Sequence, residues 1–123
     1  MKFYFKILTL LLFLLLANRI AKAGNCIPSG TTVTLTRQSE VDSFPINYPD
    51  CDVIEGNLII TGDNISNLDS LIGLKRVEND LEINANAALV NLRGLDSLNY
   101  VTYFDILNNQ SLTSFVGLNN LDT

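Results

Sequence analysis

The sequence predicts a β-rich fold: a short solenoid with a parallel sheet along one side and a cap at its N-terminal end. Two observations lead to this prediction. From residue 56 onward, apolar residues recur with a period of 23 or 24 residues, alternating at first and then stepping by threes. Residues 24–55 lack this period and hold both cysteines of the chain. Because one repeat cannot bury its own apolar face, such units are expected to stack.

The first 23 of the 123 residues have the order of a secretory signal peptide. Lys2 and Lys6 form a basic start, and residues 7–17 are almost wholly apolar. Residues 21–23, Ala-Lys-Ala, offer a cleavage site of the small-x-small type. The apolar core is shorter than the ~20 residues that a helix needs to span a bilayer, which disfavours an uncleaved membrane anchor. We therefore expect a secreted or cell-surface protein with no stable transmembrane span after signal cleavage.

Cleavage changes the charge balance of the chain. It removes four of the eight Lys and Arg residues and none of the 13 acidic residues, which leaves a net charge of −9. A protein of this sign is repelled by phosphate backbones and by anionic membrane surfaces. The composition therefore argues against nucleic acid as a partner.

The two cysteines, Cys26 and Cys51, are expected to form a disulfide, because an exported chain meets an oxidising compartment. The loop of about 25 residues that they close corresponds to ~3 kcal/mol of chain entropy. A zinc site is a poor alternative, since the chain has no His and no second thiolate pair. Asp50, Asp52 and Glu55 lie beside Cys51, but their spacing matches no calcium loop. We expect no metal and no cofactor.

Residues 24–55 are predicted to form the N-terminal cap. Residues 32–36 alternate polar and apolar side chains, as a strand does. Ser39 and Asp42 have the spacing of a capping box, which predicts a short helix through Phe44 that Pro45 would end. A stack of repeats needs an atypical terminal unit to cover its open core, and the expected disulfide would tie that unit to the first repeat.

Residues 56–123 are predicted to form the repeats, and the period lies within the range of leucine-rich repeats. The strand of each repeat contributes one pair of apolar residues: Leu58 and Ile60, Leu81 and Ile83, Phe104 and Ile106. The rest of each repeat steps by threes, as in Leu89, Leu92, Leu95, Leu98 and Val101. Such a step favours a 3₁₀-like or extended convex side over the alternative of one amphipathic α-helix per repeat, which the many Gly and Asn residues also disfavour.

A polar residue follows each strand at a fixed distance. Asp63, Asn86 and Asn109 come three residues after the isoleucine of their strands. Side chains at this place can form hydrogen bonds with backbone groups of their own unit and of the adjoining unit. These three residues are therefore predicted to form a hydrogen-bonded ladder along the stack.

The last repeat is predicted to be incomplete. Leu112, Phe115, Leu118 and Leu121 repeat the apolar set, yet nothing after Thr123 covers them. We therefore expect that further repeats of the same chain are missing, and that the bare final unit associates with itself.

Two sequence segments resemble a known family: "CDVIEGNLIITG", with a cysteine upstream of it, and "DLEINANAALVNLRGLDSL". From about residue 26 to 123, the chain resembles the receptor L-domain branch of leucine-rich-repeat proteins. The stretch "TLTRQSEVDSFPINYPDCDVIEGNLII" is similar to the opening of secreted or surface-attached members from Bacteroidetes-type bacteria. The resemblance implies a short right-handed solenoid with a ligand-binding role and no catalytic residues.

Strand alternation defines a candidate contact surface. If Leu58 and Ile60 point inward, the side chains between them point outward, and stacking lines them up in columns. Glu82 and Asp105 would then be neighbours at about 4.8 Å, a spacing at which two carboxylates could serve glycosidase-like chemistry. Carboxylates on an open sheet lack the desolvation that tunes such groups, so a solvated face is favoured. The candidate contact residues are Ile59, Glu82, Tyr103, Asp105 and Leu107.

These observations favour a non-catalytic extracellular recognition or adhesion module whose partner is an extracellular protein or a glycan. The alternative is a structural spacer, or the N-terminal stub of a longer surface protein, with no ligand of its own. A hydrolase is a remote third hypothesis, because the chain has no His and no nucleophile–base pair.

Overall fold

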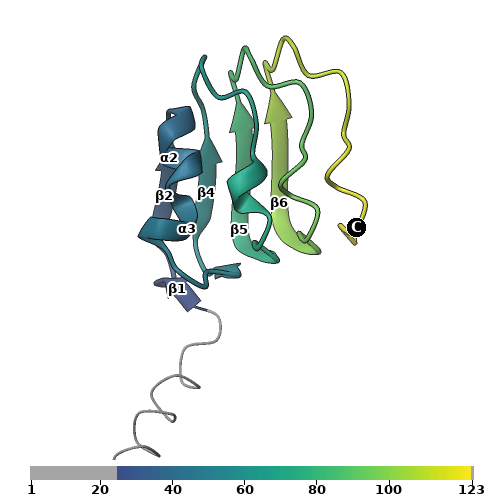
Figure 1. Cartoon of the computed structure of the whole chain (residues 1–123). Helices are drawn as coiled ribbons and strands as arrows, with labels where there is room; N and C mark the ends of the chain where they lie inside the picture. The colour runs from purple at the N-terminus through teal and green to yellow at the C-terminus, as the bar shows by residue number, and fades with distance from the viewer. Residues whose placement is uncertain (1–24, 123) are drawn as a thin grey trace, which may run out of the picture.

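A computed structural model describes residues 25–122, which form one sheet backed by turns and short helices (Figure 1). The predicted signal peptide, residues 1–23, lies outside the described residues. Within the described range, no helix has the length and apolar character needed to cross a membrane.

The sheet is parallel throughout. Its strands are β1 (Asn25–Ile27), β2 (Thr32–Leu35), β3 (Val53–Ile54), β4 (Asn57–Ile60), β5 (Arg76–Asn84) and β6 (Tyr100–Leu107). The first residues of the long strand β5 pair with β3, and its later residues pair with β4. β3 and β4 therefore lie one after the other beside β5, and together they form one rung, which is one strand position in the sheet. The strands β1 and β2 form the rung before it, and β6 pairs with the other side of β5. Among the described residues, the sheet is open at both edges.

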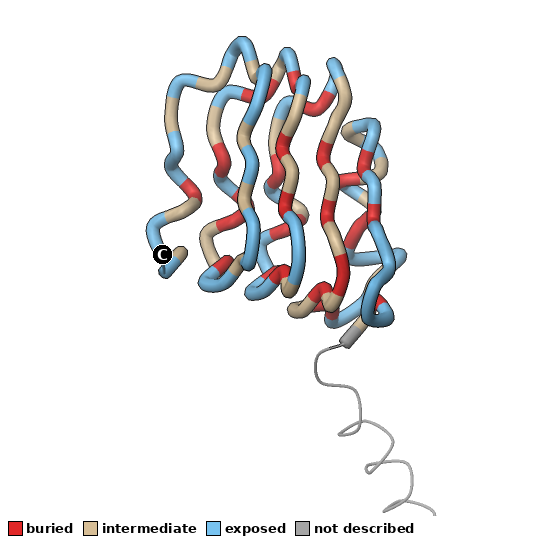
Figure 2. Tube along the Cα trace, turned by 180° about the vertical axis from the view of Figure 1, so that it is seen from behind, coloured by how far each residue is buried: buried red, intermediate tan, exposed pale blue. Residues whose placement is uncertain are grey.

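The apolar strand pairs point into the core. Leu58, Ile60, Leu81 and Ile83 are completely buried, whereas Ile59 and Glu82 between them are partly exposed. Figure 2 shows the same alternation along the chain. Each fully buried Leu or Ile contributes roughly 1.5–3 kcal/mol relative to an exposed one, so these rows supply much of the driving force for folding.

The chain returns from one strand to the next through turns. We call a strand and the segment that follows it a repeat unit, so that units begin at β4, β5 and β6. The N–H of Leu74 donates to the Leu71 carbonyl at 2.9 Å, and that of Leu98 donates to the Leu95 carbonyl at 2.9 Å. The only regular helix in these segments is the 3₁₀-helix η1, Asp69–Leu71. The predicted 3₁₀-like or extended convex side is confirmed, and the alternative of an amphipathic α-helix per repeat is wrong for the described residues.

We keep the name cap for residues 25–55, whose helical part differs from the prediction. It contains two helices, α2 (Gln38–Asp42) and α3 (Phe44–Asn47), in place of one that Pro45 ends. Pro45 lies in the first turn of α3, where a missing N–H has no helical partner to lose. Ser39 does not cap α2, which begins one residue earlier. Instead, Glu40 accepts a hydrogen bond from the Thr36 N–H at 2.6 Å.

Gln38 joins the cap to the first repeat unit. Its Oε1 accepts from the N–H groups of Ser66 at 2.8 Å and Asn67 at 3.2 Å, and its Nε2 donates to the Asn67 carbonyl at 3.2 Å. One side chain therefore satisfies three backbone groups of a turn that has no regular structure.

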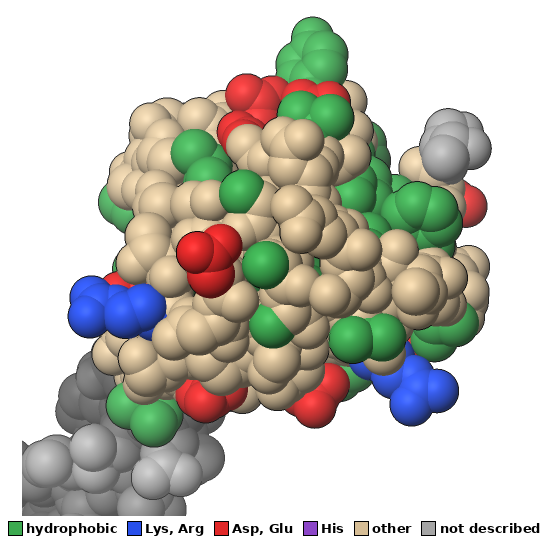
Figure 3. All heavy atoms as spheres, turned by 90° about the horizontal axis from the view of Figure 1, so that it is seen from above, with side chains coloured by type: hydrophobic (Ala, Val, Ile, Leu, Met, Phe, Trp, Pro, Cys, Tyr) green, Lys and Arg blue, Asp and Glu red, His purple; other side chains and the backbone are tan. Residues whose placement is uncertain are grey.

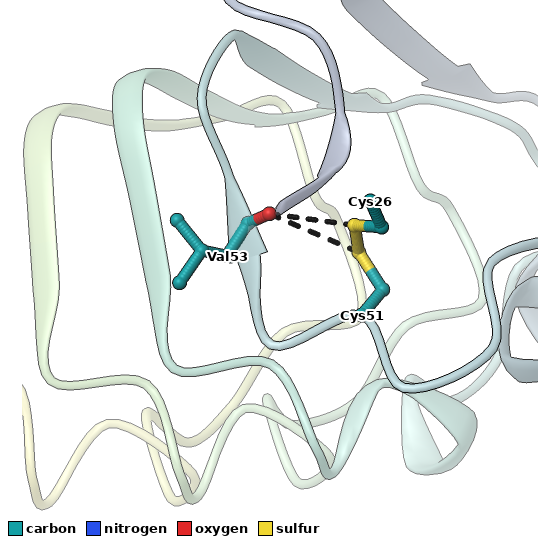
Figure 4. Close-up of a disulfide and its surroundings, with 3 residues drawn as sticks. All are labelled: Cys26, Cys51 and Val53. Atoms are coloured by element: carbon teal, nitrogen blue, oxygen red, sulfur yellow. Dashed lines mark hydrogen bonds between the residues drawn. A yellow bond between two sulfur atoms is a disulfide. The ribbon is translucent and has the colours of Figure 1, made fainter. Parts of the chain in front are cut away.

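The predicted disulfide between Cys26 and Cys51 is present (Figure 4). It links β1 to the segment that leads into β3. The Val53 carbonyl oxygen lies 3.3 Å from the Cys26 sulfur and 3.9 Å from the Cys51 sulfur. These are close contacts, because a disulfide has no S–H to donate. The covalent bond therefore holds the first rung against the second.

Two asparagines bond buried backbone groups of the preceding repeat unit. Asn86 is fully buried, its Nδ2 donates to the Ile60 carbonyl at 3.0 Å, and its Oδ1 accepts from the Gly62 N–H at 2.9 Å. Asn109 acts in the same way one unit later, donating to the Ile83 carbonyl at 2.8 Å and accepting from the Asn86 N–H at 2.9 Å. Both side chains supply partners that the turn itself lacks.

Asp63 does not take the corresponding place in the first unit. It is exposed, and its carboxylate makes no such bond. The counterpart of Asn86 is Gly62, since the Ile65 N–H donates to the Gly62 carbonyl as the Leu89 N–H does to that of Asn86.

The prediction failed at Asp63 because the units differ in length. The second unit holds one extra residue before its asparagine, Ala85, whose φ is +55°. In the shorter first unit the chain comes close to the cap, and a β-carbon at Gly62 would collide with the Thr36 carbonyl oxygen. The Thr61 N–H donates to the Leu35 carbonyl at 2.9 Å, so that carbonyl needs no side-chain donor.

Burial declines in the last unit. Leu92 and Leu95 are completely buried. Of their counterparts in the last unit, Phe115 is 63% exposed and Leu118 is half-buried. In Figure 2, the buried positions thin out toward the end marked C.

Candidate functional site

One column of side chains crosses the outer face of the sheet from the cap to β6. The register places Thr34 beside Ile59, Ile59 beside Glu82, and Glu82 beside Asp105, as strand alternation predicts for the last three. Adjacent rungs of a sheet lie about 4.8 Å apart, so one ligand could contact several members at once.

A second column runs parallel to the first and is held by hydrogen bonds. Asn57 Nδ2 donates to Thr32 Oγ1 at 3.1 Å, and Asn57 Oδ1 accepts from the Asp80 N–H at 3.3 Å. Asp80 pairs in register with Tyr103 on β6. The backbone and side chains together fix the position of this polar row.

The apolar members of the face lie on β6. The side chain of Tyr103 is 67% exposed and that of Leu107 is 52% exposed, with the exposed Asp105 between them in sequence. In the view from above, acidic and hydrophobic side chains gather at the upper rim, which is the sheet side of the molecule (Figure 3). Aromatic side chains are enriched at protein interfaces, so the exposed Tyr103 suits contact with another molecule.

The predicted carboxylate pair is present in register but open to water. Glu82 is half-buried and accepts a hydrogen bond from Asn84 Nδ2 at 3.0 Å, while Asp105 is exposed. A general acid for glycoside cleavage needs a carboxyl group held protonated by a dry environment. The geometry therefore equips these groups to accept hydrogen bonds from a ligand. Within residues 25–122, no group of three or more His, Cys, Asp and Glu side chains is arranged to hold a metal ion.

The cap contributes to this face, which the sequence alone did not predict. Thr32 and Thr34 are exposed and extend both columns by one rung. The alternation of residues 32–36 gave the signal, but only the register shows that this strand lies beside β4.

Residues 50–122, more than half of the chain, match the model of the receptor L domain. The chain belongs to this family. No curated protein matches the sequence. The predicted likeness to receptor L domains is thus confirmed over the segment from Asp50 to the last unit. The cap strands β1 and β2 and both cap helices precede the matched segment.

A receptor L domain is an extracellular module that binds ligands, which fits a role in recognition without catalysis. The disulfide points to the same location, because such bonds persist in oxidising compartments. The family and the disulfide therefore both point to an extracellular location.

Proposed function

We propose that this receptor L domain is a non-catalytic recognition or adhesion module that binds an extracellular protein or glycan through the outer face of its sheet. The exposed Tyr103 ring beside the carboxylates carries the proposal. Tyrosine supplies a large amphipathic contact area and has few rotatable bonds to fix on binding. Leu107 and Ile59 add apolar area, and Glu82 and Asp105 add acceptors.

The proposal includes the organisation of the chain. Residues 1–23 direct export as a signal peptide, residues 24–55 act as the cap, and residues 56–123 form a short leucine-rich-repeat solenoid. Export places the module in the medium or on the cell surface, as in the Bacteroidetes-type proteins that the sequence resembles.

The test is binding of the purified chain to an array of glycans and cell-surface protein ectodomains. We expect Tyr103→Ala to weaken the strongest signal about thirtyfold, the effect of losing a central aromatic contact of about 2 kcal/mol. Phe115→Ala is the matched control, because this ring is also exposed, at 63%, but lies outside both columns.

Equal losses in both variants would contradict the sheet face as the contact surface. Absence of any signal would favour the alternative of a structural spacer without a ligand. We expect no glycan to be cleaved; a hydrolysis that Glu82→Gln abolishes would overturn the non-catalytic assignment.

A further inference from the structure

A groove of about 560 Å³ lies on the opposite side of the molecule from the sheet face, between α3 and η1. These two short helices contact each other and stand in front of the sheet in Figure 1. Phe44 and Tyr48 line the groove on the cap side, and Leu71, Ile72 and Gly73 line it on the repeat side. Asp50, Cys51 and Asp52 also line it.

The walls of the groove are apolar and held in place. The rings of Phe44 and Tyr48 lie 5.0 Å apart at an angle of 44°, and Phe44 is buried in the core. Leu71 is buried opposite them, while Ile72 is 53% exposed at the rim. An aliphatic or aromatic side chain placed here would be covered on two sides. The open rim suits a side chain that enters from a partner protein better than an enclosed small molecule, which needs most of its surface buried.

The space beside Gly73 is empty. A β-carbon at this position would have no other atom within 4 Å, and the backbone is not in the left-handed region. The counterpart of Gly73 in the next unit is Ser97, which does not line the groove. The glycine therefore keeps the groove open without being required by the fold.

The charges at the groove are acidic. Asp50 and Asp52 line it, and neither Lys nor Arg does. Only one carboxylate oxygen of Asp52 has an ionic partner. Oδ2 lies 3.2 Å from Lys75 Nζ, whereas Oδ1 is buried without a hydrogen-bond partner. Asp50 is exposed. The surrounding residues 25–122 carry four basic and 13 acidic side chains, so the wider field has the same sign. A cation is attracted to this end of the groove.

We propose that the groove is a second binding site, which receives a protein segment carrying an apolar side chain next to a Lys or Arg. The apolar side chain lies between Tyr48 and Ile72, and the cation lies at the exposed carboxylate of Asp50. This site is separate from the sheet face and stands or falls independently of the function proposed above.

The test is an NMR titration of the purified chain with N-acetyl-Phe-Arg-amide. We expect saturable shifts at low millimolar concentration, confined to residues 44–52 and 70–74. N-acetyl-Phe-Glu-amide is expected to bind at least threefold more weakly. Gly73→Phe fills the groove and abolishes the shifts, whereas Ser97→Phe at the equivalent place one unit later leaves them intact.

Asp50→Asn tests the role of charge without disturbing the backbone. Asp50 has a φ of +59°, a conformation that Asn adopts more readily than most residues. Removal of one exposed charge is expected to weaken the Phe-Arg probe by about two- to fivefold. The proposal is overturned if the wild-type chain shows no saturable shift at 10 mM, if Gly73→Phe binds as well as the wild type, or if the two peptides bind equally.

Discussion

The strands at the two ends of the sheet, β2 and β6, have the same apolar alternation but bury it to different degrees. At the N-terminal end, Val41 and Phe44 of the cap helices are buried, and Leu35 is only 4% exposed. At the C-terminal end, β6 has no further rung beside it among residues 25–122, and Phe115 is 63% exposed. Leucine periodicity therefore places a side chain in the inner row, but its burial depends on the unit that covers it.

Substitutions at equivalent leucines should measure this difference directly. Leu95→Ala removes a fully buried side chain and is expected to lower the free energy of unfolding by about 2–5 kcal/mol. Leu118→Ala, at the equivalent and half-buried position, should cost less than half as much. Urea unfolding of the two variants gives both values. Equal losses would mean that the last unit is as well covered as the one before it.

The disulfide should account for part of the advantage of the N-terminal end. A Cys26→Ala, Cys51→Ala double variant is expected to lose ~3 kcal/mol, because the unfolded chain regains the freedom of the closed loop. Hydrogen exchange should rise first in α2 and α3 and only later in β6. A uniform rise along the chain would show that the cap and the repeats unfold as one body.

The middle of the sheet offers a test of the buried amide bonds. Asn86→Ala leaves the Ile60 carbonyl and the Gly62 N–H without their side-chain partners and is expected to cost ~1–3 kcal/mol. Asn91→Ala removes a single local bond, to the Arg93 N–H at 3.0 Å, and should cost about 0.5 kcal/mol. Similar melting temperatures for the two variants would refute a structural role for Asn86.

The smallest expected effect concerns pH and the cap. A hydrogen bond from the Thr36 N–H to the carboxylate, aided by Arg37, lowers the pKa of Glu40 below its ordinary value of 4.5. A lowered pKa stabilises the fold above the ordinary value, and this stabilisation is lost as the pH falls through the lowered one. Glu40 is at the surface and only partly buried, so the change should be slight. The melting temperature of Glu40→Gln should therefore fall less at acidic pH than that of Asp122→Asn. The second variant is the control, because it removes an acidic charge at the other end of the sheet. If the melting temperature falls equally at low pH in Glu40→Gln and in the wild type, the Glu40 carboxylate does not cause the fall.

The sequence predicted the parallel sheet, the inner rows and the disulfide, because each depends on a local pattern or on residue type alone. It failed where the outcome depends on the distance between segments. Asp63 follows its isoleucine at the predicted spacing, but that turn is one residue shorter than in the next unit, and Gly62 takes the place against the cap.

The candidate site shows the same limit. Alternation placed Glu82 and Asp105 on the outer face, yet Thr34 joined their column only through the register of β2 with β4. The groove between α3 and η1 was not predicted either, since it arises from two segments that meet only in the folded chain. The spacing of Phe44 and Tyr48 on one side of a helical turn was the available signal.

The nearest-neighbour pairing of the rungs has a consequence for the order of folding. Partners such as Leu58 and Leu81 are about 23 residues apart, so no step requires distant parts of the chain to meet. Contacts between cap and first unit, made by Gln38 and the disulfide, favour nucleation at the N-terminal end. We expect growth to proceed rung by rung in the direction of synthesis, with each finished strand serving as the template for the next. A rung added at the far edge would leave the earlier ones undisturbed.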